Sequence, residues 1–117
     1  MSASQPTDGR THSARIAALN DRLRTTLAGG KVMMTAGVQA RGSEFVTKAI
    51  AAMQVFTAFD ADNDPYGEHD FGAFEFDGHR LFFKLDYYSP DMTSGSEDPA
   101  DPAQTVRVLT LMLTEEY

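Results

Sequence analysis

Apolar residues recur at helical spacing in two segments of the first half of the chain. In residues 13–28 they form one stripe, which consists of Ile16, Leu19, Leu23 and Leu27. In residues 43–59 they form a broader face, which consists of Phe45, Val46, Ala49, Ile50, Met53 and Phe56. Ser13 and Ser43 are both suited to cap a helix N-terminus, and Gly29-Gly30 is suited to end the first helix. The pattern predicts two helices, each with a buried face.

The strongest local signal in the chain is a hairpin over Phe71–Tyr88. Its two halves alternate apolar and polar residues around Asp77-Gly78, a pair that favours two-residue turns because both central positions need positive φ. This turn places Glu75 opposite Arg80. It also gives the hairpin a core face, made of Phe74, Phe76, His79, Leu81, Phe83, Leu85 and Tyr87.

Two further strands complete the predicted sheet. Residues 31–35 are short and rich in Val and Met, and residues 105–113 are β-branched or apolar at both parities, as in a central strand. A helix beginning with Pro102 is the alternative for the last segment, and we favour the strand. The predicted fold is therefore α+β, in the order α-β-α-β-β-β. It has a mostly antiparallel four-stranded sheet with two helices on one face.

The composition fits one soluble domain. The chain has 117 residues, of which 42% are hydrophobic, and contains no cysteine. We predict a flexible tail over residues 1–12 and a single domain over residues 13–117. No apolar run is long enough to span a membrane, and the polar first residues do not form a signal peptide, so a cytoplasmic protein is expected.

Charge is distributed unevenly along the chain. Residues 1–59 contain seven basic and three acidic residues, whereas residues 60–101 contain twelve acidic residues and two basic ones. A segment with a net charge of −10 repels phosphates, which argues against direct nucleic-acid binding by this acidic half. Arg15, Arg22 and Arg24 of the first helix could contact phosphates, but they lack the interleaved aromatic residues of a binding stripe.

Several motifs of the second half together resemble one family. They are the stretch from Asp62 to Gly72, FKLDYY (83–88), SEDPADP (96–102), RVLTLML (107–113) and the pair Glu116-Tyr117. From about Ile16 to Tyr117 the chain resembles an uncharacterised bacterial family, domain of unknown function 3768. The resemblance implies no established chemistry. It implies a habitat on chromosomes, plasmids and phage-like elements, which is shared by many anti-restriction and anti-CRISPR factors.

The charge pattern and this habitat lead to one functional hypothesis. We expect a non-enzymatic protein that binds the basic surface of a partner, such as a nucleic-acid-handling defence complex, and inhibits it by mimicking DNA. The expected contact residues are Asp60, Asp62, Asp64, Tyr66, Glu68, Asp70, Asp91, Glu97, Asp98 and Asp101. No cofactor is predicted.

Three alternatives remain open. Asp60, Asp62, Asp64, Glu68 and Asp70 could supply oxygen ligands to Ca²⁺ or Mg²⁺, although Pro65 and Phe71 depart from an EF-hand loop. His69 and Asp86 could form an acid–base pair, without any accompanying nucleophile or phosphate-binding motif. A structural or regulatory domain is the third alternative.

Overall fold

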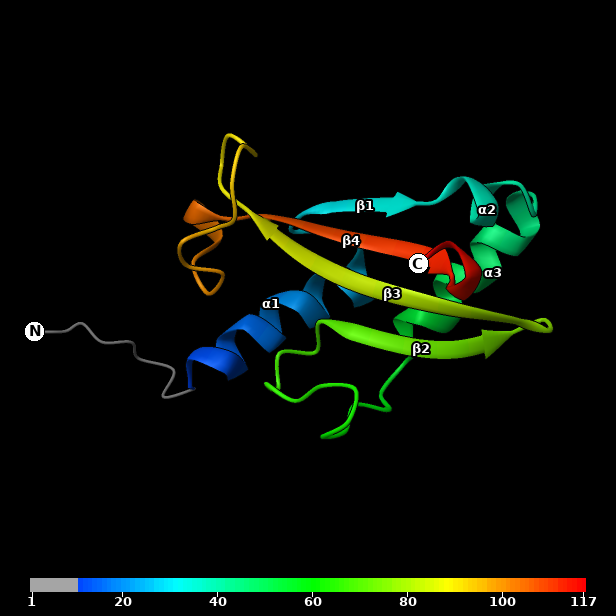
Figure 1. Ribbon diagram of the computed structural model, residues 1–117, viewed down its shortest axis with the longest axis horizontal. Helices are drawn as coiled ribbons and strands as arrows, with labels where there is room; N and C mark the ends of the chain where they lie inside the picture. The colour runs from blue at the N-terminus through cyan, green and yellow to red at the C-terminus, as the bar shows by residue number, and fades with distance from the viewer. Residues whose placement is uncertain (1–10) are drawn as a thin grey trace, which may run out of the picture.

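The computed structural model describes residues 11–117 and shows an α+β fold (Figure 1). In chain order its elements are α1 (His12–Thr26), β1 (Lys31–Met34), α2 (Ala36–Gln39), α3 (Ser43–Gln54), β2 (Phe71–Phe76), β3 (His79–Tyr88), the 3₁₀ turn η1 (Pro102–Gln104), β4 (Val106–Leu113) and the 3₁₀ turn η2 (Thr114–Glu116). The predicted fold class and element order are confirmed, and the one-turn helix α2 is an addition. The predicted tail falls mostly outside the described residues.

The four strands form one mixed sheet in the order β1-β4-β3-β2. The last strand, β4, lies inside the sheet, where it pairs with β1 in parallel and with β3 in antiparallel orientation. The strand interpretation of residues 105–113 is therefore right, and residues of both parities are buried along β4. Two of the three strand pairings, β2–β3 and β3–β4, are antiparallel.

The hairpin has the register that the sequence predicts. Phe76 pairs with His79 and Glu75 with Arg80, whose charged groups lie 3.7 Å apart. Asp77 and Gly78 both have positive φ, +52° and +77°, as the two-residue turn requires.

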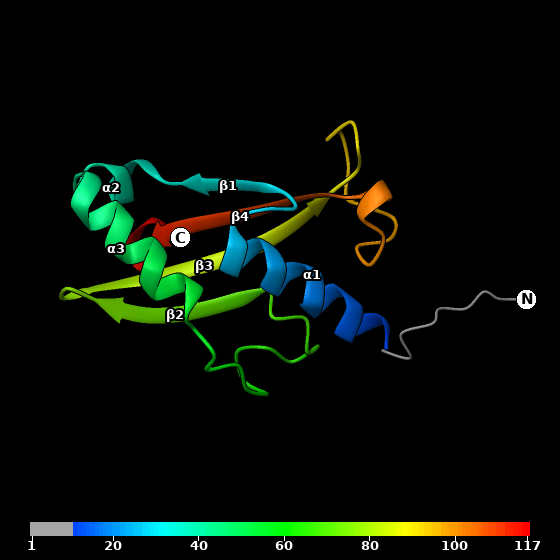
Figure 2. The same cartoon turned by 180° about the vertical axis from the view of Figure 1, so that it is seen from behind.

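Helices α1 and α3 cover one face of the sheet, which is best seen from behind (Figure 2). The core lies between them and the strands. It consists of Leu23, Val38, Phe45, Ala49, Met53, Phe56, Leu81, Phe83, Leu85, Leu109, Leu111 and Leu113. Among residues 11–117, no helix has the length and apolar composition needed to cross a membrane.

The helix ends differ from the predicted ones. Thr11, not Ser13, caps α1, and α1 ends at Thr26 because Leu27 adopts the left-handed conformation. Gly42, not Ser43, occupies the N-cap of α3, which stops at Gln54 instead of continuing to about Phe59. Arg24 of α1 accounts for this early end, because its guanidinium donates to the carbonyls of Met53, Gln54 and Phe56.

Candidate functional site

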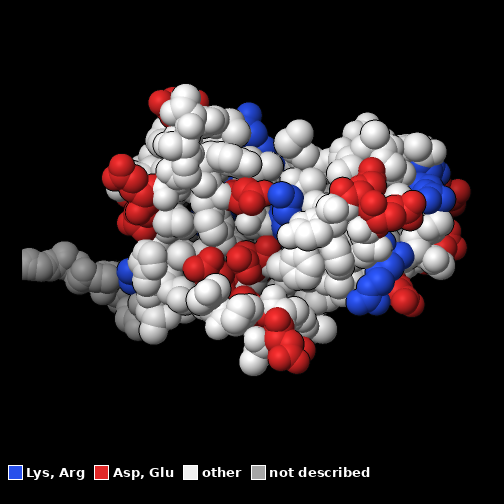
Figure 3. All heavy atoms as spheres, viewed as in Figure 1, with Lys and Arg blue, Asp and Glu red and all other residues white. Residues whose placement is uncertain are grey.

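Two loops at one end of the sheet carry nine of the chain's acidic residues and no lysine or arginine. We call residues 55–70, between α3 and β2, the first acidic loop, and residues 89–104, between β3 and β4, the second acidic loop. On the face shown in Figure 3, acidic side chains predominate in the half of the molecule that contains both loops. Around the hairpin turn, acidic and basic side chains lie side by side.

Inside the first acidic loop, two aspartates fix the backbone conformation by accepting hydrogen bonds from backbone amides. The Oδ1 atom of Asp60 accepts hydrogen bonds from the amides of Asp62 and Asn63, at 2.9 and 3.0 Å. Asp64 accepts from the amides of Glu68 and His69, at 2.9 and 3.1 Å, and is only 7% exposed. Asp64, one of the predicted contact residues, is therefore used within its own loop and presents little surface to a partner.

His69 attaches the first acidic loop to α1. Its Nδ1 lies 3.0 Å from both carboxylate oxygens of Asp21, and its ring stacks on Phe59 with a centroid distance of 4.1 Å. The predicted alternative paired His69 with Asp86, but Asp86 instead contacts Lys84 at 3.1 Å. The arrangement is that of a structural clasp, because the imidazole is engaged by its ring face and by its Nδ1 atom.

A buried polar network joins the two acidic loops. Arg107 of β4 donates its Nε–H to Asn20 of α1 at 2.6 Å, and one Nη2–H to the carbonyl of Pro99 in the second loop. Asn20 in turn donates to the carbonyl of Glu68 in the first loop (2.9 Å) and to the hydroxyl of Tyr87 (2.8 Å). Since Arg107 and Asn20 are almost fully buried, this network fixes both loops against the same rigid sheet.

The network also engages the side chain of Glu68. The Tyr87 hydroxyl donates to Oε1 of Glu68 at 3.0 Å, and burial is the main cause that raises the pKa of Tyr87. The guanidinium of Arg107 lies over the Tyr87 ring, 5.2 Å from its centroid. Glu68 is therefore half-buried and held in one orientation.

Asp70 sits in an unfavourable electrostatic environment. Partial burial is the main cause that raises its pKa above the ordinary aspartate value, and the negative charges of Glu68, Asp64 and Asp86 raise it further. At neutral pH, the folded protein therefore keeps a carboxylate charged at a cost in stability. Such accumulations of like charge are more typical of binding surfaces than of purely structural loops.

In the second acidic loop, carboxylates organise the backbone and stay ionised. Hydrogen bonds from Ser89 and Thr93 lower the pKa of Asp91 to about 2. Asp98 accepts from His12 of α1 at 3.0 Å, and this bond is the main cause of its lowered pKa. Asp101 caps η1 through the amide of Ala103. All three aspartates hold defined positions, and the lowered pKa values of Asp91 and Asp98 keep these two carboxylates ionised at neutral pH.

The remaining predicted contact residues are open to solvent. The side chains of Asp62 and Glu97 are exposed and make no hydrogen bond within the described residues, and Tyr66 is 75% exposed in the first acidic loop. Over residues 11–117, no three His, Asp or Glu side chains are arranged to hold a metal ion. Arg24, which was considered for phosphate contact, is buried against Phe59 and Phe83.

Several residues that organise the site were not singled out from the sequence. Arg107 interrupts the apolar run of residues 105–113, and Asn20 occupies the apolar stripe of α1 four residues after Ile16. A charged or amide group at such a position must be hydrogen-bonded if it is buried, which is a signal for an internal polar network. The signal identifies the groups but not their partners.

A family model described as "Protein of unknown function (DUF3768)" matches residues 34–116. The match covers most of the chain, which therefore belongs to this family of uncharacterised proteins. It begins later than the resemblance predicted from the sequence motifs, at the end of β1. No curated protein and no solved structure matches the chain.

Proposed function

We propose that this protein is a non-enzymatic binding factor whose two acidic loops engage a basic surface of a protein partner. The observation that carries the proposal is the gathering of nine carboxylates, without a lysine or arginine in either loop, on loops tied to one buried network. A surface of this kind attracts a partner over long range and presents charges at fixed spacing.

Two buried arginines lie beneath this end of the molecule. Arg24 and Arg107 are 4% and 2% exposed, so their charges are turned into the core and do not reach the surface as cations. Both give their hydrogen bonds mainly to backbone carbonyls and to Asn20. Neither guanidinium therefore forms part of the surface that would meet a partner.

The surface also offers an anchor that charge does not provide. Tyr66 is 75% exposed within the field of the first acidic loop, and exposed tyrosines often supply the desolvated contacts of an interface. Basic grooves that normally hold nucleic acid fit the charge pattern best, because their lysines and arginines are spaced for successive phosphates. The specific form of the proposal is therefore an inhibitor that competes with nucleic acid for such a groove.

Charge reversal tests the proposal. Asp62→Lys combined with Glu97→Lys changes one exposed residue in each loop, and neither residue caps its loop. The matched control combines Glu75→Lys with Glu115→Lys, which alters net charge equally at the opposite end of the molecule. A partner captured by the wild type and purified should bind the loop variant at least about tenfold more weakly and the control variant normally.

The nucleic-acid part of the proposal needs its own measurement. The purified partner should bind DNA or RNA, and the wild-type protein should displace that nucleic acid in a competition assay, whereas the loop variant should not. Equal partner affinity of the wild type and the loop variant at low salt would exclude the acidic surface. A partner whose nucleic-acid binding is unaffected would exclude the mimicry alone.

A further inference from the structure

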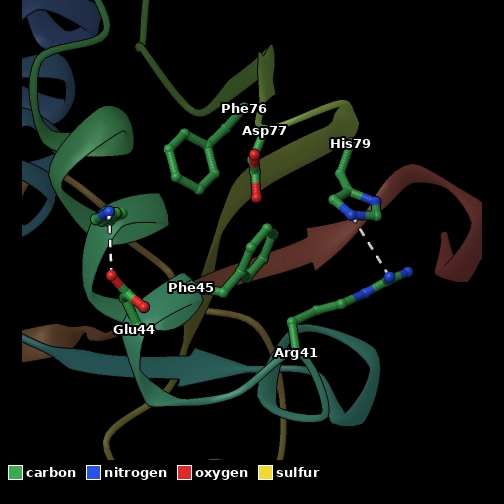
Figure 4. A pocket seen from close by; sticks show the side chains of 7 residues that line it. Arg41, Glu44, Phe45, Phe76, Asp77 and His79 are labelled. Atoms are coloured by element: carbon green, nitrogen blue, oxygen red, sulfur yellow. Dashed lines mark hydrogen bonds and ion pairs between the residues drawn. The ribbon is translucent and has the colours of Figure 1, made fainter.

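The opposite end of the molecule contains a cleft of about 530 Å³ (Figure 4). Its walls come from three places: the α2–α3 connection, the first turns of α3, and the turn of the β2–β3 hairpin. The hairpin turn is distant in the sequence from the other two segments, and the fold brings it beside them at the end remote from the acidic loops (Figure 1). The cleft takes no part in the proposed function.

Aromatic rings form the apolar part of the cleft. Phe45 of α3 and Phe76 of β2 pack with their ring centroids 5.3 Å apart, and the ring of His79 meets Phe45 edge-on at 5.4 Å. Phe45 is buried in the core, so this part of the wall is rigid. A flat or branched apolar group of a ligand could rest on it.

Arg41 is the distinctive polar group of the cleft. Its Nη1 atom lies 3.5 Å from Nε2 of His79, a weak contact that leaves most guanidinium N–H groups available. Within residues 11–117, Arg41 makes no ion pair with a carboxylate. Glu116 feels the positive charge of Arg41, but its oxygens are occupied by Thr35 and the amide of Gly37.

The other charged groups of the cleft limit which ligands can bind at Arg41. Lys48 is already paired with Glu44 at 3.2 Å, and the carboxylate of Asp77 points towards the same cleft (Figure 4). The cleft therefore contains one guanidinium without a carboxylate partner, an adjacent imidazole and two carboxylates. A ligand with a single negative charge suits this balance, whereas a doubly charged phosphate would be repelled by Glu44 and Asp77.

We propose that this cleft binds a small monocarboxylate that carries an aromatic or branched apolar group. The carboxylate lies against the guanidinium of Arg41, on the side not occupied by His79, because a guanidinium can donate two parallel hydrogen bonds to it. The apolar group packs on Phe45 and Phe76.

NMR titration of the full chain with 3-phenylpropanoate tests this site. The expected result is a saturable shift of signals from residues 41–48 and 76–79. The neutral isostere 3-phenylpropanamide should bind at least about tenfold more weakly, because it lacks the charge that Arg41 recognises. This comparison uses only the wild-type protein, so it does not depend on the folding of a variant.

Two variants locate the interaction. Arg41→Gln should weaken binding of 3-phenylpropanoate about tenfold. The control variant Arg80→Gln changes an arginine of the β2–β3 hairpin that lies outside the cleft, and it should bind like the wild type. The proposal is overturned by absence of a saturable shift, by equal binding of the acid and the amide, or by full affinity in folded Arg41→Gln. Tighter binding of phenyl phosphate than of 3-phenylpropanoate would overturn the preference for a single charge.

Discussion

Charged residues are arranged in opposite ways at the hairpin end and at the acidic end of the sheet. At the hairpin end, acidic residues lie beside basic ones, as Glu75 does with Arg80 and Glu44 with Lys48. At the acidic end, Arg24 and Arg107 are buried, and Asp60, Asp91 and Asp101 accept hydrogen bonds from backbone amides of their own loops. The first arrangement is neutral and open, whereas the second is strongly negative and held in place from inside.

The two ends differ in how much their polar residues contribute to stability. Exposed ion pairs such as Glu75–Arg80 contribute little to stability because water screens them. The buried groups below the acidic loops contribute more, because each unsatisfied partner there carries a desolvation penalty. The acidic end can therefore tolerate like-charge repulsion at its surface because an internal network holds both loops.

The largest effect is expected from Arg107→Met. Removing this guanidinium leaves the Asn20 side-chain oxygen and the Pro99 carbonyl without their donor, at roughly 1–3 kcal/mol for each buried group. We expect a loss of about 2–4 kcal/mol in the free energy of unfolding, measured by urea denaturation. Arg80→Met at the hairpin end is the matched control and should change it by less than about 0.5 kcal/mol. Equal effects of both changes would contradict the contrast between the two ends.

A smaller effect is expected from Gly78→Val at the hairpin turn. Gly78 has a φ of +77°, which a β-branched residue adopts only with strain of about 1–3 kcal/mol. A Cβ at this position has open space around it, so the loss would come from the backbone alone. Thermal unfolding should show a lowered Tm, and Gly78→Asn should keep most of the stability because Asn tolerates positive φ. A normal Tm for Gly78→Val would disprove the strain argument.

The smallest effect, and the only gain, is expected from Asp70→Asn. The raised pKa of Asp70 means that its ionised form destabilises the folded state above that pKa, and that this penalty disappears below the ordinary aspartate value. The variant should melt about 1–2 °C higher than the wild type at pH 7, since water screens the half-exposed group. The difference should vanish as the pH falls below about 3.8. A lower Tm at pH 7 would show that Asp70 is stabilising.

Local signals were sufficient for much of the fold. The Asp77-Gly78 turn set the register of the hairpin, and the apolar run of residues 105–113 identified the strand inside the sheet. The end of α3 could not be predicted in the same way, because Arg24, thirty residues earlier in the chain, takes the carbonyls on which the helix stops. Likewise, α2 is a single turn and too short for a periodic pattern.

The candidate site was predictable in charge but not in arrangement. Composition identified both acidic loops, yet nothing in the sequence distinguishes the buried Asp64 from the exposed Asp62 two residues earlier. The difference comes from a turn in which Asp64 accepts the amides of Glu68 and His69. The clasp between His69 and Asp21 spans 48 residues and depends on the packing of α1 over the sheet.

The position of β4 has a consequence for synthesis on the ribosome. This strand joins β1, made from residues 31–34, to the β2–β3 hairpin, so neither can be linked to the other until residue 113 has been translated. Until then, β1 has no strand partner and one backbone edge of β3 is unpaired. Sheet assembly must therefore follow translation of this segment, and the unfinished chain is a natural client for chaperones that cover open strand edges.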